Sequence, residues 1–204
     1  MKPGTAGTSF KLHFGGQSIN IVLPLPGEHN VRNACAAAAV CLSIGIDAQV
    51  IRDGLESVEA ASGRLTRLEA VGGALLFDDS YNANPASVDA ASDFIAAGDG
   101  ESILVLGDMR ELGSNAEELH RQAGRHAKAA GVSQLVGTGE LTRHAVEGFG
   151  EGAHWLPNVE AIVEFLRPRL RKGQRLLVKG SRSMHMGRVV RALQSDSATD
   201  AGTV

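Results

Sequence analysis

The start of the chain alternates apolar and polar positions in two short segments. In 9-SFKLHF-14 and 18-SINIVL-23 every second residue is apolar, which is the pattern of a strand with one buried face. Gly15 and Gly16 stand between the segments and favour a tight turn. The pattern therefore predicts a β-hairpin at the start of the chain.

An alanine-rich stretch follows, and its apolar spacing is helical. Asn30 is a good N-cap and Gly45 a good helix stop, so a helix is predicted between them. Asp47 is predicted to cap a second helix. Because a hairpin and two helices bury little apolar surface, they are unconvincing as a separate domain. We therefore predict that residues 1–62 are the C-terminal part of a larger domain.

From residue 63 to residue 194, compact apolar runs alternate with amphipathic segments. The runs are typical of buried strands, and they are 74-ALLFD-78, 102-SILVLG-107, 134-QLVGT-138, 153-AHWL-156 and 175-RLLVKG-180. Helices are predicted near residues 86–97, 115–130, 140–148, 158–170 and 185–194. This alternation predicts an α/β fold with a doubly wound, mostly parallel sheet, and a frayed polar tail over residues 195–204.

The composition is that of an ordinary soluble protein. Hydrophobic residues make up 43% and charged residues 21% of the 204 positions, and the net charge of -3 gives no basic footprint for a nucleic acid. The start lacks a signal-peptide core, and 34-ACAAAAVCL-42 is too short to span a bilayer. We expect a cytoplasmic monomer that binds neither nucleic acid nor a membrane. We also expect no metal site, because the histidines and cysteines lack ligand spacing.

Polar side chains gather directly after the predicted strands. In an open parallel sheet the ligand lies beyond the carboxyl ends of the strands, so these positions are candidates for a binding site. They are Asp78, Asp79, Tyr81, Asn82 and Asn84, then Asp108, Met109 and Arg110, then Thr138, and finally Lys179, Ser181, Arg182 and Ser183. The loop 179-KGSRS-183 precedes a helix, and its backbone N–H groups and two cations suit a phosphate or a carboxylate.

Other interpretations of the same residues stay open at this point. Asn and Asp satisfy their own backbone and Pro85 favours a helix start, so 78-DDSYNANP-85 is also a turn signal. Lys179 and Arg182 are consistent with solvated surface charges. A stand-alone binding or receiver-type signalling module also has paired acids after its first strand and a lysine after its last. Its phosphorylated Asp follows the third strand, however, where this chain has 137-GTG-139. A dinucleotide oxidoreductase is disfavoured because no G-x-G-x-x-G follows the first strand.

Five segments, in order along the chain, resemble motifs of the Mur ligase family. They are 26-PGEHNVRNACAAAAVCLSIG-45, 63-GRL-65, 78-DDSYNANP-85, 105-VLGDMRELG-113 and 178-VKGSRSM-184. The first is shared across that family, whereas the last three are similar to the branch that adds D-alanyl-D-alanine. Sister ligases that add diaminopimelate or lysine usually carry D-Y-A-H-T-P at the third segment. The resemblance is therefore to the D-alanyl-D-alanine-adding branch.

The resemblance implies an ATP-dependent amide ligase of peptidoglycan precursor synthesis. ATP and Mg²⁺ would be its cofactors, and UDP-N-acetylmuramoyl-tripeptide and D-alanyl-D-alanine its substrates. Residues 1–62 would be the end of the central ATP-binding domain, and residues 63–194 the C-terminal Rossmann-like domain. The 204 residues contain no G-T-x-G-K-T phosphate loop, and the family's Mg²⁺ ligands are expected outside them. We therefore expect these residues to be inactive alone.

The resemblance also assigns roles to the polar residues, although it assigns no catalytic residue to this chain. The implied ATP-binding residues are His29, Asn30, Asn33, Arg64 and Asp79, and the implied substrate-binding residues are Tyr81, Asn82, Asn84, Lys179, Ser181 and Arg182. Asp79 is the strongest candidate, because a strand-end carboxylate can accept hydrogen bonds from two ribose hydroxyls. We expect this carboxylate to be solvated before a ligand arrives, so that Asp79→Ala would leave folding nearly intact. Asp78 should point the other way.

Overall fold

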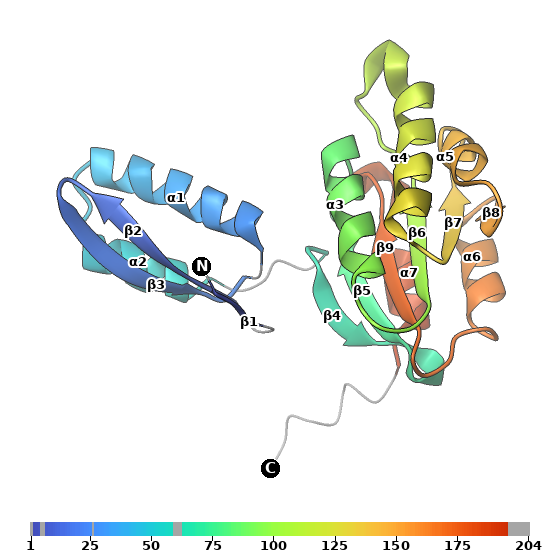
Figure 1. The fold of residues 1–204 in the computed structure, drawn as a ribbon, viewed down its shortest axis with the longest axis horizontal. Coiled ribbons are helices and arrows are strands. Elements are labelled where there is room, and N and C mark those ends of the chain that lie inside the picture. The colour runs from blue at the N-terminus through green and yellow to red at the C-terminus, as the bar shows by residue number, and fades with distance from the viewer. Residues whose placement is uncertain (1, 5–6, 26, 59–62, 196–204) are drawn as a thin grey trace. The chain divides into compact units, whose positions relative to one another are not determined.

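The chain divides into two units, Met1–Ala61 and Ser62–Val204. The computed structural model describes residues 2–4, 7–25, 27–58 and 63–195 of the chain. Figure 1 shows the strands and helices of each unit.

The first unit is a three-stranded antiparallel sheet with two helices. Its elements are β1 Lys2–Gly4, β2 Gly7–Phe14, β3 Gln17–Leu23, α1 Glu28–Ser43 and α2 Ala48–Glu56. β2 and β3 form the predicted hairpin, in which Phe14 pairs with Gln17. Ile21 and Leu23 of β3 are buried, as the alternating pattern requires.

The start of α1 differs from the prediction, whereas its end and the start of α2 agree with it. Gly27 is the N-cap residue, with φ of 99°, and Asn30 lies inside the helix, so the predicted Asn30 cap is wrong. Glycine adopts this positive φ without a steric cost, which turns the chain into the helix earlier. The predicted stop is confirmed, because Gly45 has φ of 84°. The Asp47 cap is also confirmed, since its carboxylate accepts a hydrogen bond from the Gln49 N–H at 2.8 Å.

The second unit is built on a six-stranded sheet with the order β4-β5-β9-β6-β7-β8. Its strands are β4 Thr66–Glu69, β5 Leu75–Asp79, β6 Ser102–Gly107, β7 Gln134–Thr138, β8 Ala153–Trp155 and β9 Arg175–Lys179. Its α-helices are α3 Pro85–Ala96, α4 Ala116–Ala130, α5 Thr142–Phe149, α6 Val159–Leu166 and α7 Gly187–Leu193, and its short 3₁₀ turns are η1 Val71–Gly73, η2 Gly113–Asn115 and η3 Arg182–Met184. Among the described strands of this sheet, only β4, which the sequence did not predict, pairs antiparallel with its neighbour.

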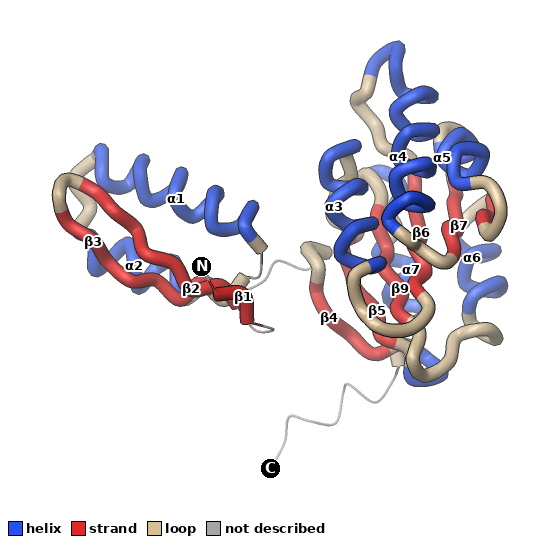
Figure 2. The backbone as a smooth tube through the Cα atoms, in the orientation of Figure 1, coloured by secondary structure: helices blue, strands red, loops and turns tan. Residues whose placement is uncertain are grey.

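The helices cover both faces of this sheet, so the predicted doubly wound α/β fold is confirmed (Figure 2). The chain steps from β5 to β8 in one direction through α3, α4 and α5, and returns through α6 to β9 in the middle of the sheet. Since crossovers are right-handed, the outgoing and returning helices must lie on opposite faces. Ile95 and Phe149 therefore share one core with Leu177, while Ile162 and Val189 share the other with Val178.

The described end of the chain pairs with the sheet. The Ser195 N–H donates a hydrogen bond to the Glu69 carbonyl at 2.9 Å, and Gln194 bridges Ala70. The rest of the predicted frayed tail, residues 196–204, lies outside the described residues. No helix among the described residues has the length and apolar character needed to cross a membrane.

Helices α4 and α5 approach each other closely at two glycines. A Cβ atom on Gly124 would lie 1.9 Å from the Ala145 carbonyl oxygen, and one on Gly148 would lie 2.2 Å from the Arg121 carbonyl oxygen. We predict that Gly124→Ala lowers the free energy of unfolding by about 1–3 kcal/mol, because the helices must move apart. Urea unfolding followed by Trp155 fluorescence measures this change.

The matched control is Gln122→Ala on the exposed side of α4. It should change the free energy of unfolding by no more than about 0.5 kcal/mol. Equal midpoints for the Gly124 and Gln122 variants would show that the two helices do not depend on this close contact.

Candidate functional site

The candidate site lies in the second unit, at the carboxyl ends of β5, β9 and β6. The helices that follow β5 and β6 cover one face of the sheet, and the helix that follows β9 covers the other. An open α/β sheet binds its ligand at such a topological switch point. The loops over residues 80–84, 108–113 and 180–186 lie at this switch point, and they carry the three most distinctive sequence motifs.

A partly buried ion pair joins the ends of β5 and β9. The Lys179 ammonium donates to Asp79 Oδ2 at 2.7 Å and to the Asn82 carbonyl at 3.0 Å. The Lys179 side chain is only 4% exposed and that of Asp79 is 19% exposed. The expectation of a solvated Asp79 is therefore wrong. The cause is the parallel register, which makes Asp79 and Lys179 neighbours on one face of the sheet.

Asp78 points to the opposite face, as its alternation with Asp79 predicted. Its Oδ1 atom accepts hydrogen bonds from the Ser80 N–H at 3.1 Å and from the Ser80 hydroxyl at 2.6 Å. Asp78 thus stabilises the turn that follows β5. The side chain of its neighbour Asp79 is 19% exposed.

Two cations from different parts of the unit lie close to the Tyr81 ring. The Arg64 guanidinium is 4.6 Å from the centre of the Tyr81 ring, and the Arg182 guanidinium is 5.7 Å from it. The Tyr81 N–H donates to the Gly63 carbonyl at 3.0 Å. Tyr81 is 43% exposed, and both arginines are exposed as well. Exposed guanidinium groups beside an aromatic ring suit an anionic or planar ligand.

Asn82 and Asn84 organise the turn before α3. Asn82 Oδ1 accepts from the Ala83 N–H at 2.9 Å. Asn84 Oδ1 accepts from the Ser87 N–H at 2.9 Å, and the Ser87 hydroxyl accepts from the Asn84 N–H, which forms a capping box with Pro85 in the first turn. The turn explanation of this stretch is thus confirmed. Both asparagines remain exposed at the candidate site.

Ser181 connects the β9 loop to the β6 loop. Its hydroxyl accepts from the Arg110 N–H at 2.8 Å, and its own N–H donates to the Asp108 carbonyl at 3.0 Å. Ser181 and Lys179 are 4% and 3% exposed, so the interpretation of Lys179 as a solvated surface charge is wrong. Of the three residues expected to face anionic substrates, Arg182 is the exposed one.

Asp108 anchors the β6 loop to α5, a role that the sequence analysis missed. It is fully buried, and its Oδ1 atom accepts from the Thr142 N–H at 2.9 Å and the Thr142 hydroxyl at 2.8 Å. The Arg110 guanidinium lies 3.4 Å from its Oδ2 atom. Gly139, at φ of 106°, leaves room for the carboxylate, since a Cβ there would lie 2.2 Å from Oδ1. The only sequence signal was the Asp directly after a buried strand.

His120 anchors the same loop to α4. It is fully buried, its Nε2 atom accepts from the Met109 N–H at 2.9 Å, and its Nδ1 atom lies 2.6 Å from the Ala116 carbonyl. Because a carbonyl only accepts, Nδ1 carries the proton and the ring is neutral. Burial lowers the pKa of His120 below its usual value, which favours this neutral form.

The remaining predicted ATP-binding residues belong to the first unit. His29, Asn30 and Asn33 lie in the first turns of α1, where Asn30 and Asn33 share a helix face. Asn33 is exposed and Asn30 is half-buried. Within the ranges that the structure describes, no group of three or more His, Cys, Asp or Glu side chains is arranged to hold a metal ion.

Comparison with known proteins identifies the class to which this fold and site belong. The profile of the Mur ligase glutamate ligase domain matches residues 63–182, and the chain belongs to the Mur ligase family. The resemblance drawn from the sequence motifs is thereby confirmed.

Several of the similar proteins are named as one kind of Mur ligase. The chain is 41% identical to the UDP-N-acetylmuramoyl-tripeptide–D-alanyl-D-alanine ligase of Escherichia coli strain K12, over 93% of the chain and 42% of that protein. It spans about two fifths of the length of such relatives. A crystal structure of MurF from Acinetobacter baumannii superposes with a TM-score of 0.79 and 31% identity, over 93% of the chain and 42% of that structure.

A third comparison extends the likeness in fold. MurF ligase from Thermotoga maritima, solved in complex with ADP, superposes with a TM-score of 0.73 at 21% identity, covering 93% of the chain and 43% of that structure.

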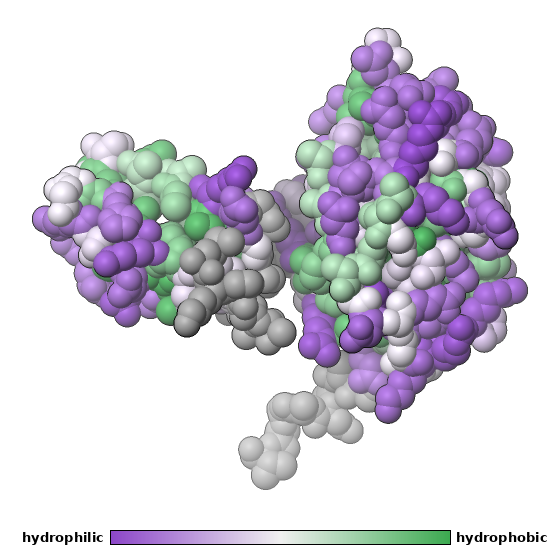
Figure 3. Space-filling view, in the orientation of Figure 1, coloured by the Kyte–Doolittle hydropathy of each residue, from purple (hydrophilic) through white to green (hydrophobic). Residues whose placement is uncertain are grey.

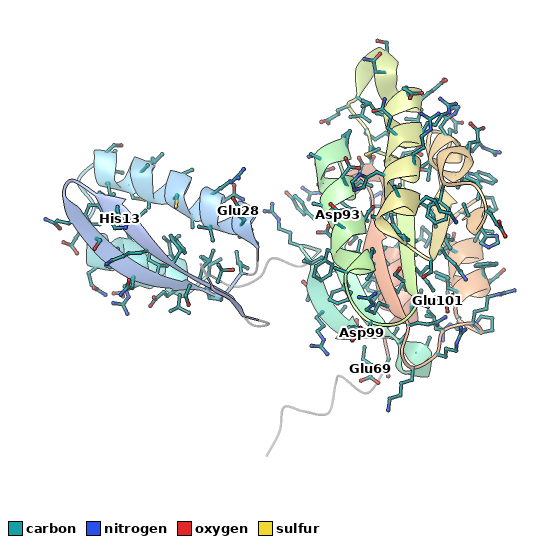
Figure 4. All side chains as sticks on the ribbon, in the orientation of Figure 1. His13, Glu28, Glu69, Asp93, Asp99 and Glu101 are labelled. Atoms are coloured by element: carbon teal, nitrogen blue, oxygen red, sulfur yellow. The ribbon has the colours of Figure 1, made fainter. Side chains whose placement is uncertain are left out.

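The Asp79–Lys179 pair generates a prediction about stability. Asp79→Ala should lower the free energy of unfolding by about 3 kcal/mol, because it leaves the buried Lys179 ammonium without its charged partner. Urea unfolding at neutral pH measures the change. The matched control is Asp99→Ala, which removes an exposed acid from the turn after α3 (Figure 4) and should have little effect. A small effect in both variants would mean that the pair adds no net stability.

His120 generates a prediction about pH. Its pKa is lowered in the folded chain, so below about pH 6.5 the unfolded chain binds a proton that the folded chain does not. The contribution of a neutral His120 to the free energy of unfolding is therefore fully present above that pH. On acidification this contribution falls by at most about 1.4 kcal/mol per pH unit. The free energy of unfolding should fall less between pH 7.5 and 5.5 in His120→Gln than in the unsubstituted chain. Identical losses would contradict this assignment.

Proposed function

We propose that these residues serve in an ATP-dependent ligase that joins D-alanyl-D-alanine to UDP-N-acetylmuramoyl-tripeptide in peptidoglycan precursor synthesis. The observation that carries the proposal is the convergence of three motif loops at the switch point of a Mur ligase domain. The relative with 41% identity is named for this reaction. A cytoplasmic location and a monomeric state belong to the same proposal.

Asp79 and Arg64 are proposed to bind ATP. Asp79 Oδ2 accepts from Lys179, and the Asp79 side chain is 19% exposed. Its other carboxylate oxygen is proposed to accept from hydroxyl donors such as those of a ribose. The exposed Arg64 guanidinium beside Tyr81 suits the anionic part of a nucleotide. His29, Asn30 and Asn33 of the first unit are also proposed to bind ATP. The Thermotoga maritima relative was solved with ADP, which accords with this assignment.

The acid and amine substrates are proposed to bind at the loop after β5 and the loop after β9. Tyr81, Asn82, Asn84 and Arg182 present exposed polar groups there. In the proposed reaction the tripeptide carboxylate is activated as an acyl phosphate, and the dipeptide amine then displaces phosphate. Alignment of the substrates is the contribution required of these residues, since it makes the attack effectively intramolecular. Lys179 and Ser181, which are buried, contribute by holding the loops.

The first unit is proposed to be the end of an ATP-binding domain, and residues 63–194 a C-terminal domain. Val40, Ile44 and Val50 are 63%, 72% and 61% exposed in the first unit, and Figure 3 displays hydrophobic residues over α1. Such apolar exposure is expected of a segment that packs against further chain. The described residues do not fit Mg²⁺, since they offer no cluster of ligands. The Mg²⁺ ligands are therefore proposed to lie in the portion of the relatives that these residues do not span.

The receiver-type alternative has less support. A receiver has its strands in the order 2-1-3-4-5, whereas the parallel strands here run β5-β9-β6-β7-β8, which is 1-5-2-3-4 in chain order. The third parallel strand, β7, ends at Thr138 and carries no acid.

We predict that the 204 residues alone neither hydrolyse ATP nor form the amide bond. They contain no glycine-rich phosphate loop, and phosphoryl transfer depends on such electrostatic stabilisation. A full-length ligase that carries them should release phosphate only when ATP, UDP-N-acetylmuramoyl-tripeptide and D-alanyl-D-alanine are all present. A coupled phosphate assay measures both cases. Turnover by the 204 residues, or a full-length enzyme that prefers a single amino acid to the dipeptide, would refute the proposal.

A further inference from the structure

Lys179 is the buried centre of the candidate site. Its ammonium contacts two different parts of the site, the Asp79 carboxylate at 2.7 Å and the Asn82 backbone carbonyl at 3.0 Å. Asp79 is one of the residues proposed to bind ATP, and Asn82 belongs to the loop proposed to bind the substrates. Because the side chain is 4% exposed, it has almost no surface with which to touch a ligand.

We propose that Lys179 is a positioning residue that aligns the ATP-binding carboxylate with the substrate loop. This inference rests on the proposed function for its effect on ATP. The hydrogen bond to Oδ2 fixes the rotamer of Asp79 and leaves the rest of the carboxylate for the ligand. The bond to Asn82 ties the 80–84 loop to the end of β9. A site held in this way loses less freedom when its ligands bind.

The geometry favours positioning over direct contact with an anion. A lysine that binds a substrate phosphate or carboxylate directly needs an exposed ammonium, and Arg182 offers an exposed cation nearby instead. Two of the three ammonium donors of Lys179 are already used by the protein. Its charge also offsets that of Asp79, so the pair is buried together at a lower cost than either group alone.

The first test uses the full-length ligase and the variants Lys179→Met, Lys179→Gln, Asp79→Asn and the double variant of Asp79→Asn with Lys179→Met. We expect Lys179→Met and Asp79→Asn each to raise KM for ATP about tenfold, the loss expected when one charge-assisted hydrogen bond is weakened. The double variant should be no worse than the more affected single variant, because both act on the same contact. Lys179→Gln keeps a donor and should fall between. Lys172→Met, at an exposed position, is the matched control.

Two outcomes would overturn the inference. A KM for ATP that stays unchanged in Lys179→Met, with only a lower Tm, would make Lys179 purely structural. Effects that multiply in the double variant would mean that Lys179 contacts a ligand itself.

The second test needs no turnover, so it separates this inference from the proposed function. In the 204-residue chain, Lys179→Met should accelerate amide hydrogen exchange about tenfold at Tyr81 and Ala83. Lys179→Gln should show a smaller acceleration at these two amides, and Lys172→Met should show none. Unchanged exchange in Lys179→Met would refute the positioning role even in an active enzyme. Faster exchange together with an inactive unsubstituted ligase would support the role of Lys179 and reject the proposed reaction.

Discussion

The position of β9 between β5 and β6 is the constraint on which the candidate site depends. A strand in the middle of a sheet covered on both faces must be apolar between its ends, and β9 is buried throughout, with Arg175 at its first position and Lys179 at its last. Its last residue, Lys179, is nevertheless charged, and a buried charge is tolerated only with a partner. Asp79, its register neighbour on β5, is that partner. The sheet topology thus explains why these charges occur at adjacent strand ends.

The same placement explains how the loops are held. Ser181, two residues beyond Lys179, exchanges hydrogen bonds with the backbone of the β6 loop. Asp108 of that loop accepts a hydrogen bond from Thr142 at the start of α5, and His120 of α4 accepts one from the backbone of the loop. The three loops are therefore restrained by buried polar groups, each of which has its partner within the second unit. Since losing such a partner costs more than the bond itself contributes, this network favours one loop arrangement.

The sequence was sufficient to predict the fold because its signal is local. The buried runs at β6 and β9 and the amphipathic helices between them are visible in short windows. The short edge strand β4 was missed because half of its residues are exposed. The position of the site was predictable from the rule that a ligand binds beyond the carboxyl ends of parallel strands, but the contacts between its side chains were not. Lys179 and Asp79 are 100 residues apart, and their register depends on the whole sheet.

The distribution of burial divides the motif residues into two kinds. Tyr81, Asn84 and Arg182 are exposed, whereas Lys179 and Ser181 in the same motifs are buried. A distinctive motif therefore contains residues that hold the loop as well as residues that face solvent, and residue type alone does not separate them. Since flexible loops must be ordered when a ligand binds, buried groups that order them beforehand lower the free-energy cost of binding. The buried polar residues Lys179 and Ser181 thus act on the shape of the loops.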